Sequence, residues 1–154
     1  MQFKRLVNMQ ESVVAGLKTQ IEEFITKRDH VTYAELSNHI PGFKRKVPEG
    51  ELSYLIEDGR FDNLIFWVNV SDEAVAALDR LMRDGRIHRV PTSALVYFAD
   101  GKALSIPIAK KVRSYKKPHW FPVCFRPGPY LSIKRKPDGH VDQEVGPAGR
   151  APAR

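Results

Sequence analysis

The hydrophobic pattern of this chain changes its period near Gly85. Before that residue, apolar side chains recur every three or four positions over two long stretches, which is the spacing of one face of an α-helix. After it, short runs rich in β-branched residues and alternation of apolar with polar residues are typical of strands. A chain of 154 residues has room for one hydrophobic core. The pattern therefore predicts an α+β body in which helices precede a sheet.

Three helices are predicted before Gly85. The first covers residues 9–28, where apolar residues are spaced by four, four, four and three positions. The second is short and covers Thr32–Ile40, because Thr32 can act as the N-cap and Pro41-Gly42 ends the helical pattern. The third covers Ser71–Asp84 and begins with a serine that can accept from a free backbone N–H. Gly85 can end it in the left-handed conformation.

Three short strands are predicted after Gly85, namely Ile87–Val90, Ala94–Ala99 and Ala103–Ile108. Asp100-Gly101 is a strong signal for a two-residue hairpin turn between the second and third of them. These strands would form an antiparallel meander. Further along, 123–125 and 130–133 carry enough apolar area either to add short strands or to lie across the body.

Residues 41–70 interrupt the helices. They contain a possible helical turn over Glu51–Glu57 and a turn at Asp58-Gly59-Arg60. The run Leu64–Val70 is aromatic and β-branched and predicts a buried strand. At the other end of the chain, residues 137–154 are rich in proline and glycine and contain no aromatic residue, which predicts a disordered tail.

The order of two helices, a capped helix ending in Leu-Met-Arg-Asp-Gly-Arg-Ile and a hairpin resembles the winged helix-turn-helix superfamily of DNA-binding domains. In this resemblance Thr32–Ile40 is the supporting helix, Ser71–Asp84 is the recognition helix, and Gly85-Arg86-Ile87 leads into the wing. The resemblance covers about residues 9–108 and identifies no particular family. It implies a winged-helix-like domain over 1–108 with 41–70 as an insertion, followed by a basic aromatic extension over 109–136.

The net charge of +7 is concentrated in one segment. Lys102–Lys136 contains ten basic residues and no acidic residue, whereas the remainder of the chain is slightly acidic. Such a block repels itself and usually meets an anionic partner, of which nucleic acid is the commonest. The sequence therefore predicts a nucleic-acid-binding protein, with duplex DNA as the leading partner and a regulatory or accessory role. A solvated face that keeps the chain soluble is the alternative interpretation.

The candidate binding residues fall into three groups. The strongest is the cluster of five cations within eight residues, namely Lys110, Lys111, Arg113, Lys116 and Lys117. A second group follows the third helix and could reach bases or phosphates: Arg80, Arg83, Arg86 and Arg89. The third comprises Lys134, Arg135 and Lys136, together with Trp120 as a ring on which a base could stack, and Lys44-Arg45-Lys46 is a further basic run.

Two other functions remain open. The third helix carries more acidic than basic residues, which suits a protein–protein adaptor that docks an acidic partner through the basic segment. The alternation of cations with Tyr115, Trp120, Phe121, Phe125 and Tyr130 would also suit RNA or single-stranded DNA, provided that some of these rings face solvent instead of the core. A homodimer is compatible with all three functions.

Other classes of protein are not indicated. The five histidines and one cysteine show no metal-ligand spacing, and no nucleophile, phosphate-loop or dinucleotide motif is legible, so no enzyme, metal or cofactor is predicted. One cysteine forms no internal disulfide. No apolar run approaches the length of a membrane span, and no signal peptide is recognisable. The expected location is the cytoplasm.

Overall fold

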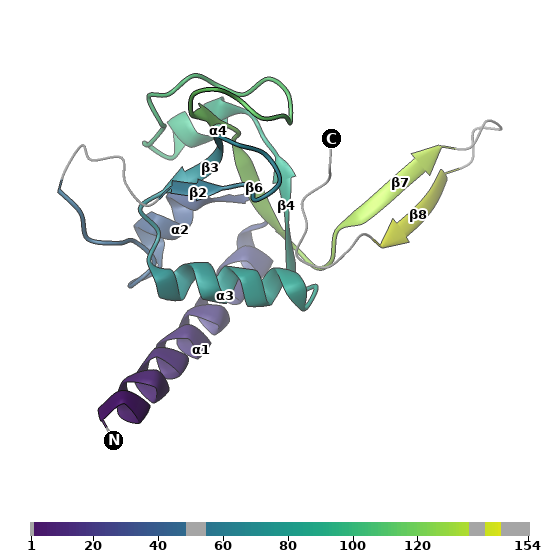
Figure 1. Ribbon diagram of the computed structural model, residues 1–154. Helices are drawn as coiled ribbons and strands as arrows, with labels where there is room; N and C mark the ends of the chain where they lie inside the picture. The colour runs from purple at the N-terminus through teal and green to yellow at the C-terminus, as the bar shows by residue number, and fades with distance from the viewer. Residues whose placement is uncertain (1, 49–54, 136–140, 146–154) are drawn as a thin grey trace.

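The computed structural model describes residues 2–48, 55–135 and 141–145, and gives side chains for 8–48 and 55–130. The fold is mixed α+β, as predicted (Figure 1). Its helices are α1 (Gln2–Arg28), α2 (Tyr33–His39), α3 (Asp72–Arg83) and α4 (Ala94–Ala99). Its strands are β1 (Val31–Thr32), β2 (Leu55–Glu57), β3 (Leu64–Val68), β4 (Ile87–Pro91), β5 (His119–Trp120), β6 (Val123–Pro127), β7 (Leu131–Arg135) and β8 (Val141–Val145).

The three helices predicted before Gly85 are confirmed. The hydroxyl of Thr32 accepts from the backbone N–H of Glu35 at 3.0 Å and caps α2. The hydroxyl of Ser71 accepts from the N–H of Ala74 at 3.2 Å and caps α3. Gly85 follows α3 with a φ of +70°, the left-handed conformation that glycine adopts at low cost. α1 differs from the prediction because it begins at Gln2 instead of residue 9.

The body of the protein contains two small three-stranded sheets. In the first, the strand order is β1-β6-β4 and both pairings are antiparallel, so that β6 lies in the centre. In the second, β3 pairs antiparallel with β2 and parallel with β5. Every residue of β3 is buried, which confirms the buried strand predicted within 64–70. The core lies between these sheets and α1, which packs against both α3 and β6.

The meander predicted after Gly85 is wrong. Ala94–Ala99 forms α4 instead of a strand, because the hydroxyl of Ser93 caps it by accepting from the N–H of Leu95 at 3.2 Å. Asp100-Gly101 ends this helix and makes no hairpin. Ala103–Ile108 forms no strand and contributes one isolated bridge, from Ile108 to Trp120. The partner of β4 is therefore β6, which is much further along the chain.

Two more segments differ from the prediction. Residues 51–54 lie outside the described part of the chain, and Leu55–Glu57 forms β2 instead of a helical turn. Val141–Val145, expected to be disordered, forms β8 and pairs antiparallel with β7 in a hairpin that extends away from the body in Figure 1. Within this hairpin Lys134 lies opposite Asp142, whereas Arg135 lies opposite Val141 and Glu144 opposite Ser132. The remaining tail residues are outside the described ranges.

No helix in the described ranges has both the length and the apolar character required to cross a bilayer.

Candidate nucleic-acid interface

The five clustered cations lie on a loop, residues 110–117, that we call the basic loop. The turn between β2 and β3 fixes the basic loop in place through hydrogen bonds made by Asp62 and Asn63. The backbone N–H of Asp62 donates to the Ser114 hydroxyl at 3.0 Å, and its carbonyl accepts from the N–H of Tyr115 at 2.9 Å. The Asn63 amide donates to the Tyr115 carbonyl at 2.8 Å, and the Asn63 carbonyl accepts from the N–H of His119 at 2.9 Å. The loop therefore has a defined backbone shape.

Tyr115 closes the basic loop on itself. Its hydroxyl donates to the Lys111 carbonyl at 2.9 Å. Its ring stacks on His119 with the centroids 4.0 Å apart, and the Arg113 guanidinium carbon lies 4.2 Å from the same centroid. Two groups this close to one ring centre cannot share a side, so both faces of the ring are covered. Tyr115 is a part of the loop structure and offers no free face for a base.

The cations of the basic loop are exposed and carry no carboxylate partner. Lys110, Lys111, Arg113, Lys116 and Lys117 are all exposed to solvent. None of the ion pairs formed by residues 8–48 and 55–130 includes them. Beside the loop is an open hollow of about 650 Å³, whose lining includes the cations Arg113 and Lys116 and the carboxylates of Glu57 and Asp62. These two carboxylates moderate the positive field locally without pairing with it.

The arginines predicted on and after the third helix are arranged differently. The Arg80 guanidinium forms two hydrogen bonds with the Glu11 carboxylate, of 2.9 and 3.0 Å, and lowers the pKa of that carboxyl. Arg86 donates from Nε to Glu22 at 2.6 Å. Both acidic partners belong to α1. Among the four predicted arginines, Arg83 alone is exposed without an ion pair in the described part of the chain.

Arg89 lies inside the body and not on the predicted binding line. Its guanidinium stacks over Phe66 at 4.2 Å from the ring centroid and donates to the Tyr33 hydroxyl at 3.2 Å. The Nε atom is buried and makes no hydrogen bond. The structure therefore does not bring Arg80, Arg83, Arg86 and Arg89 together as one free cationic stripe.

Trp120 is a core residue. Its side chain is 1% exposed, its ring N–H donates to the Phe66 carbonyl at 3.2 Å, and it packs edge-on against Tyr97 with the centroids 5.0 Å apart. It offers no surface to a base in this structure. Phe125 is buried as well. The aromatic residues of the basic segment thus mainly serve packing.

The remaining basic candidates are scattered. Lys134 and Arg135 belong to β7, and Lys136 lies outside the described residues. In the Lys44-Arg45-Lys46 run, Arg45 pairs with Asp72 on α3. Lys44 lies beside Lys102, and partial burial together with this neighbouring ammonium lowers the pKa of Lys102.

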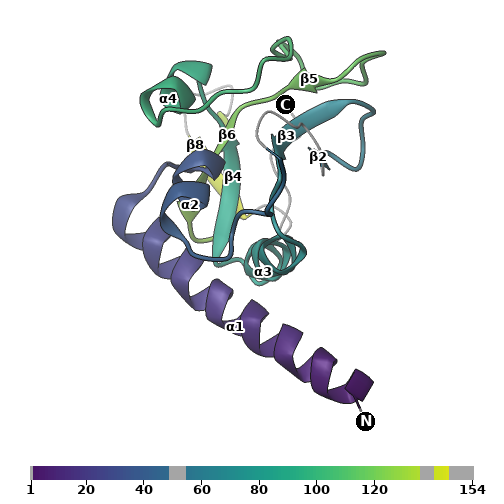
Figure 2. The same cartoon turned by 90° about the vertical axis from the view of Figure 1, so that its left-hand side faces the viewer.

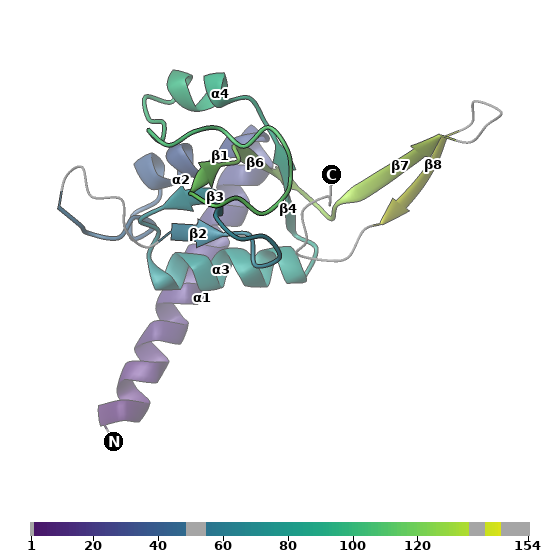
Figure 3. The same cartoon turned by 45° about the horizontal axis from the view of Figure 1, so that its top comes forward.

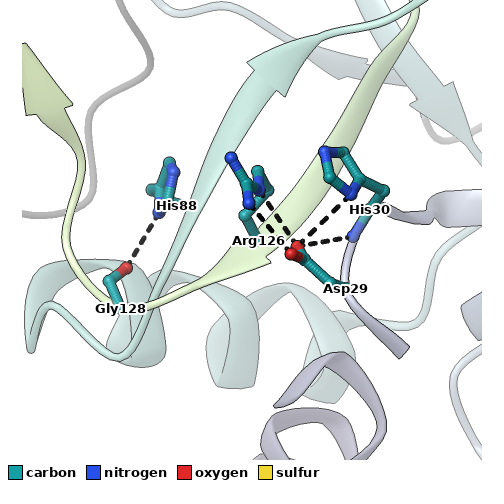
Figure 4. A network of polar contacts seen from close by, with 5 residues as sticks. All are labelled: Asp29, His30, His88, Arg126 and Gly128. Atoms are coloured by element: carbon teal, nitrogen blue, oxygen red, sulfur yellow. Dashed lines mark hydrogen bonds and ion pairs between the residues drawn. The ribbon is translucent and has the colours of Figure 1, made fainter. Parts of the chain in front are cut away.

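Sequence reasoning missed a polar cluster at the start of β1, shown in Figure 4. The Arg126 guanidinium, on β6, donates two hydrogen bonds to the Asp29 carboxylate, of 2.9 and 3.0 Å. Asp29 and His30 both have left-handed backbones, with φ of 52° and 51°, which non-glycine residues adopt at a cost. Figure 4 also shows His88 on the other side of Arg126, bonded to the Gly128 carbonyl. Two left-handed residues would have been hard to foresee, because neither is glycine.

The Asp29–Arg126 pair makes the free energy of unfolding depend on pH in the acidic range. Hydrogen bonding to Arg126 lowers the pKa of Asp29 to about 2 from an ordinary 3.8. A depressed folded-state pKa stabilises the protein above the unfolded value, and the contribution is lost as pH falls through about 2. We expect Asp29→Asn to lower the free energy of unfolding at neutral pH by about 1 kcal/mol, because the pair is partly exposed. Urea denaturation at neutral pH and at about pH 2 measures the difference.

Asparagine tolerates the left-handed conformation, so this substitution removes the charge without adding backbone strain. Asp62→Asn is the matched control, since the Asp62 side chain is exposed and forms none of the ion pairs above. Equal destabilisation of the Asp29 variant at both pH values would contradict the electrostatic explanation.

Comparison with known proteins identifies no similar family, protein or structure. The chain matches no known protein family, and neither a curated protein nor a solved structure gives a significant match. Within the described residues, no three His, Cys, Asp or Glu side chains cluster as metal ligands would.

Proposed function

We propose that this protein binds nucleic acid through the basic loop, with duplex DNA as the preferred form, and acts as a cytoplasmic regulator or accessory factor. One observation carries the proposal. Five exposed cations without carboxylate partners share a loop whose backbone is fixed by the β2–β3 turn. Lysine and arginine side chains on such a loop can neutralise phosphates and release counterions, while the loop itself loses little freedom on binding.

The aromatic rings are buried or covered, and this favours double-stranded over single-stranded nucleic acid as the ligand. Single-strand binders gain much of their affinity from bases stacked on exposed rings. Here Trp120 and Phe125 are buried, and both faces of Tyr115 are covered by His119 and Arg113. Contacts from the basic loop would thus be made to phosphates, which position a protein on a duplex without reading its sequence.

The order of the elements supports the resemblance to winged helix-turn-helix domains. Three helices, α1, α2 and α3, precede an antiparallel sheet formed by β1, β4 and β6. On this proposal residues 41–70 and 92–122 are insertions into the winged-helix pattern, and they carry the basic loop and the turn that fixes it. DNA contact would pass from the usual recognition helix to the inserted loop, because two of the arginines at α3 are paired with α1.

The decisive experiment is a fluorescence anisotropy titration of random duplex DNA, single-stranded DNA and RNA at two salt concentrations. We expect the duplex to bind most tightly and its affinity to fall with salt. Replacing Lys110, Lys111, Lys116 and Lys117 with alanine should weaken duplex binding roughly a hundredfold at about 0.1 M salt and reduce the salt slope by about one unit per lost contact.

A second quadruple variant controls for net charge. It replaces four exposed lysines outside the basic loop, namely Lys27, Lys44, Lys46 and Lys102. Both variants lose four positive charges, so a site at the basic loop predicts a much larger loss for the loop variant. Equal losses would show binding by overall charge alone, and tighter binding of the single strand would favour the RNA or single-strand function.

An adaptor function is the second candidate, and α4 supports it. Leu95 is 74% and Phe98 62% exposed, although both are large apolar side chains. Exposed apolar groups of this size often mark protein interfaces, and Lys102 follows shortly after the helix. If no nucleic acid binds at low salt, an acidic protein partner that covers α4 becomes the better explanation.

A further inference from the structure

The basic loop is held at both ends and again near its middle. Ala109, immediately before it, is buried and donates its N–H to a β5 carbonyl at 2.8 Å, and His119, which begins β5, follows it. Figures 2 and 3 show the loop, which leads into β5, next to the turn between β2 and β3. From this turn the Asn63 carboxamide donates to the Tyr115 carbonyl at 2.8 Å. Without the bonds near its middle, the loop would keep much of its conformational freedom.

Asn63 has the backbone and the side chain that this link requires. Its φ is 59°, in the left-handed region that asparagine adopts more readily than most residues. Its carboxamide bonds to Tyr115, while its carbonyl accepts from the N–H of His119 at 2.9 Å. The turn before it is itself ordered, because the buried Asp58 carboxylate accepts from the backbone N–H and the guanidinium of Arg60. Asn63 therefore joins an ordered turn to the middle of the basic loop.

A loop that is held in one shape presents its cations in a fixed arrangement. Duplex DNA is stiff and carries its phosphates at regular intervals, so it gains affinity from an array of cations that is ordered before binding. A flexible strand can follow a mobile loop without ordering it, and gains less from this order. Fixing the basic loop therefore favours a stiff polyanion over a flexible one.

We propose that Asn63 is a positioning residue that gives the basic loop its preference for duplex DNA over flexible polyanions such as single-stranded DNA. This role rests on the proposed function, because it concerns the selectivity of the same site. The Asn63 carboxamide is uncharged and is engaged by Tyr115, so its effect passes through the positions of the cations. The preference for duplex then has a second origin besides the burial of the aromatic rings.

Asn63→Gly tests the carboxamide separately from the backbone. Glycine adopts the left-handed region freely, so this substitution removes the bond to Tyr115 without adding strain. We expect the affinity for random duplex DNA to fall about tenfold at about 0.1 M salt, because the loop must then be ordered on binding. The affinity for single-stranded DNA should change less than about twofold, and the salt slope for duplex should stay within about half a unit, because the number of phosphate contacts is unchanged.

Asn69→Gly is the matched control for this substitution. Asn69 also has a left-handed backbone, with a φ of 58°, and it is partly buried like Asn63. It lies beyond the opposite end of β3, six positions along an extended chain and thus roughly 20 Å away. Both variants gain the same freedom from glycine, but only one of them loses a bond to the basic loop. Asn69→Gly should therefore bind duplex and single strand as the wild type does.

A second variant changes the order of the loop from within. Tyr115→Phe keeps the ring between Arg113 and His119 but removes the hydroxyl that donates to the Lys111 carbonyl at 2.9 Å. It should also weaken duplex binding more than single-strand binding. Hydrogen exchange measures the order directly, and the amides of the basic loop should exchange faster in Asn63→Gly than in Asn69→Gly.

The outcomes separate this role from the proposed function. A wild type that binds no duplex would overturn both. A wild type that prefers duplex, together with an Asn63→Gly variant that keeps the whole preference, would overturn the role of Asn63 alone. Equal losses for duplex and single strand would overturn it too, and so would a lower salt slope, because that result would indicate a lost phosphate contact.

Discussion

Replacing Trp120 with alanine is expected to lower the free energy of unfolding by about 3–5 kcal/mol, the range for a large buried aromatic side chain. The indole is 1% exposed and contacts Trp67 and Tyr97, with ring centroids 6.0 and 5.0 Å away. Its removal leaves a cavity between the two sheets and takes the indole N–H donor away from the Phe66 carbonyl. Thermal and urea denaturation followed by circular dichroism measure the loss.

Phe98→Ala is the control for this substitution, because it also removes an aromatic ring but from a position 62% exposed. Its effect on stability should stay within about 0.5 kcal/mol. If Trp120→Ala unfolds the chain, Trp120→Phe offers a milder change that should still be destabilising. A Trp120 variant of unchanged stability with weaker single-strand binding would instead restore this residue as a stacking platform.

The second large effect on the free energy of unfolding is expected from removing the hydroxyl group of Tyr97. The Tyr97 hydroxyl donates to the Val123 carbonyl at 2.6 Å and accepts from the backbone N–H of Tyr33 at 3.2 Å. The ring is fully buried, so Tyr97→Phe leaves a donor and an acceptor without partners in the interior. We expect a loss of about 2–3 kcal/mol in the free energy of unfolding, measured by urea denaturation.

Tyr130→Phe provides the comparison, because Tyr130 is only partly buried and its ring packs beside His88. Removing that hydroxyl should change stability by less than about 0.5 kcal/mol. Similar losses in both variants would show that the hydrogen bonds of Tyr97 contribute little beyond packing.

Local signals made the helices predictable. Thr32 and Ser71 are caps whose side chains act on residues three positions away, and this short range is visible in the sequence. The buried strand β3 was equally accessible, because its five residues are all aromatic or aliphatic.

The segment 94–99 shows where such reasoning fails. A run of six apolar residues fits a buried strand or a short helix equally well, and periodicity does not separate them. Ser93 was the available signal, since a serine before the run can cap a helix. The outcome depends on Tyr97, whose ring enters the core between Trp67 and Trp120. That contact joins distant parts of the chain and leaves no local trace.

The candidate site was predictable in one part only. The density of positive charge around Lys110–Lys117 indicated an exposed loop, and the cations there are exposed. The sequence did not indicate that Arg80 and Arg86 pair with Glu11 and Glu22, because these partners are more than sixty positions away. It also gave no sign that the β2–β3 turn would fix the loop.

The bonds that fix the basic loop to the β2–β3 turn bear on how reversibly the loop would bind a polyanion. The bonds from Asp62 and Asn63 to the basic loop use backbone groups, a hydroxyl and an amide, and none of them is an ion pair. Mobile ions screen charges but leave such neutral bonds in place. Under the proposed function, raising the ionic strength should therefore release the polyanion from a loop that keeps its shape, and lowering it again should restore binding without a refolding step.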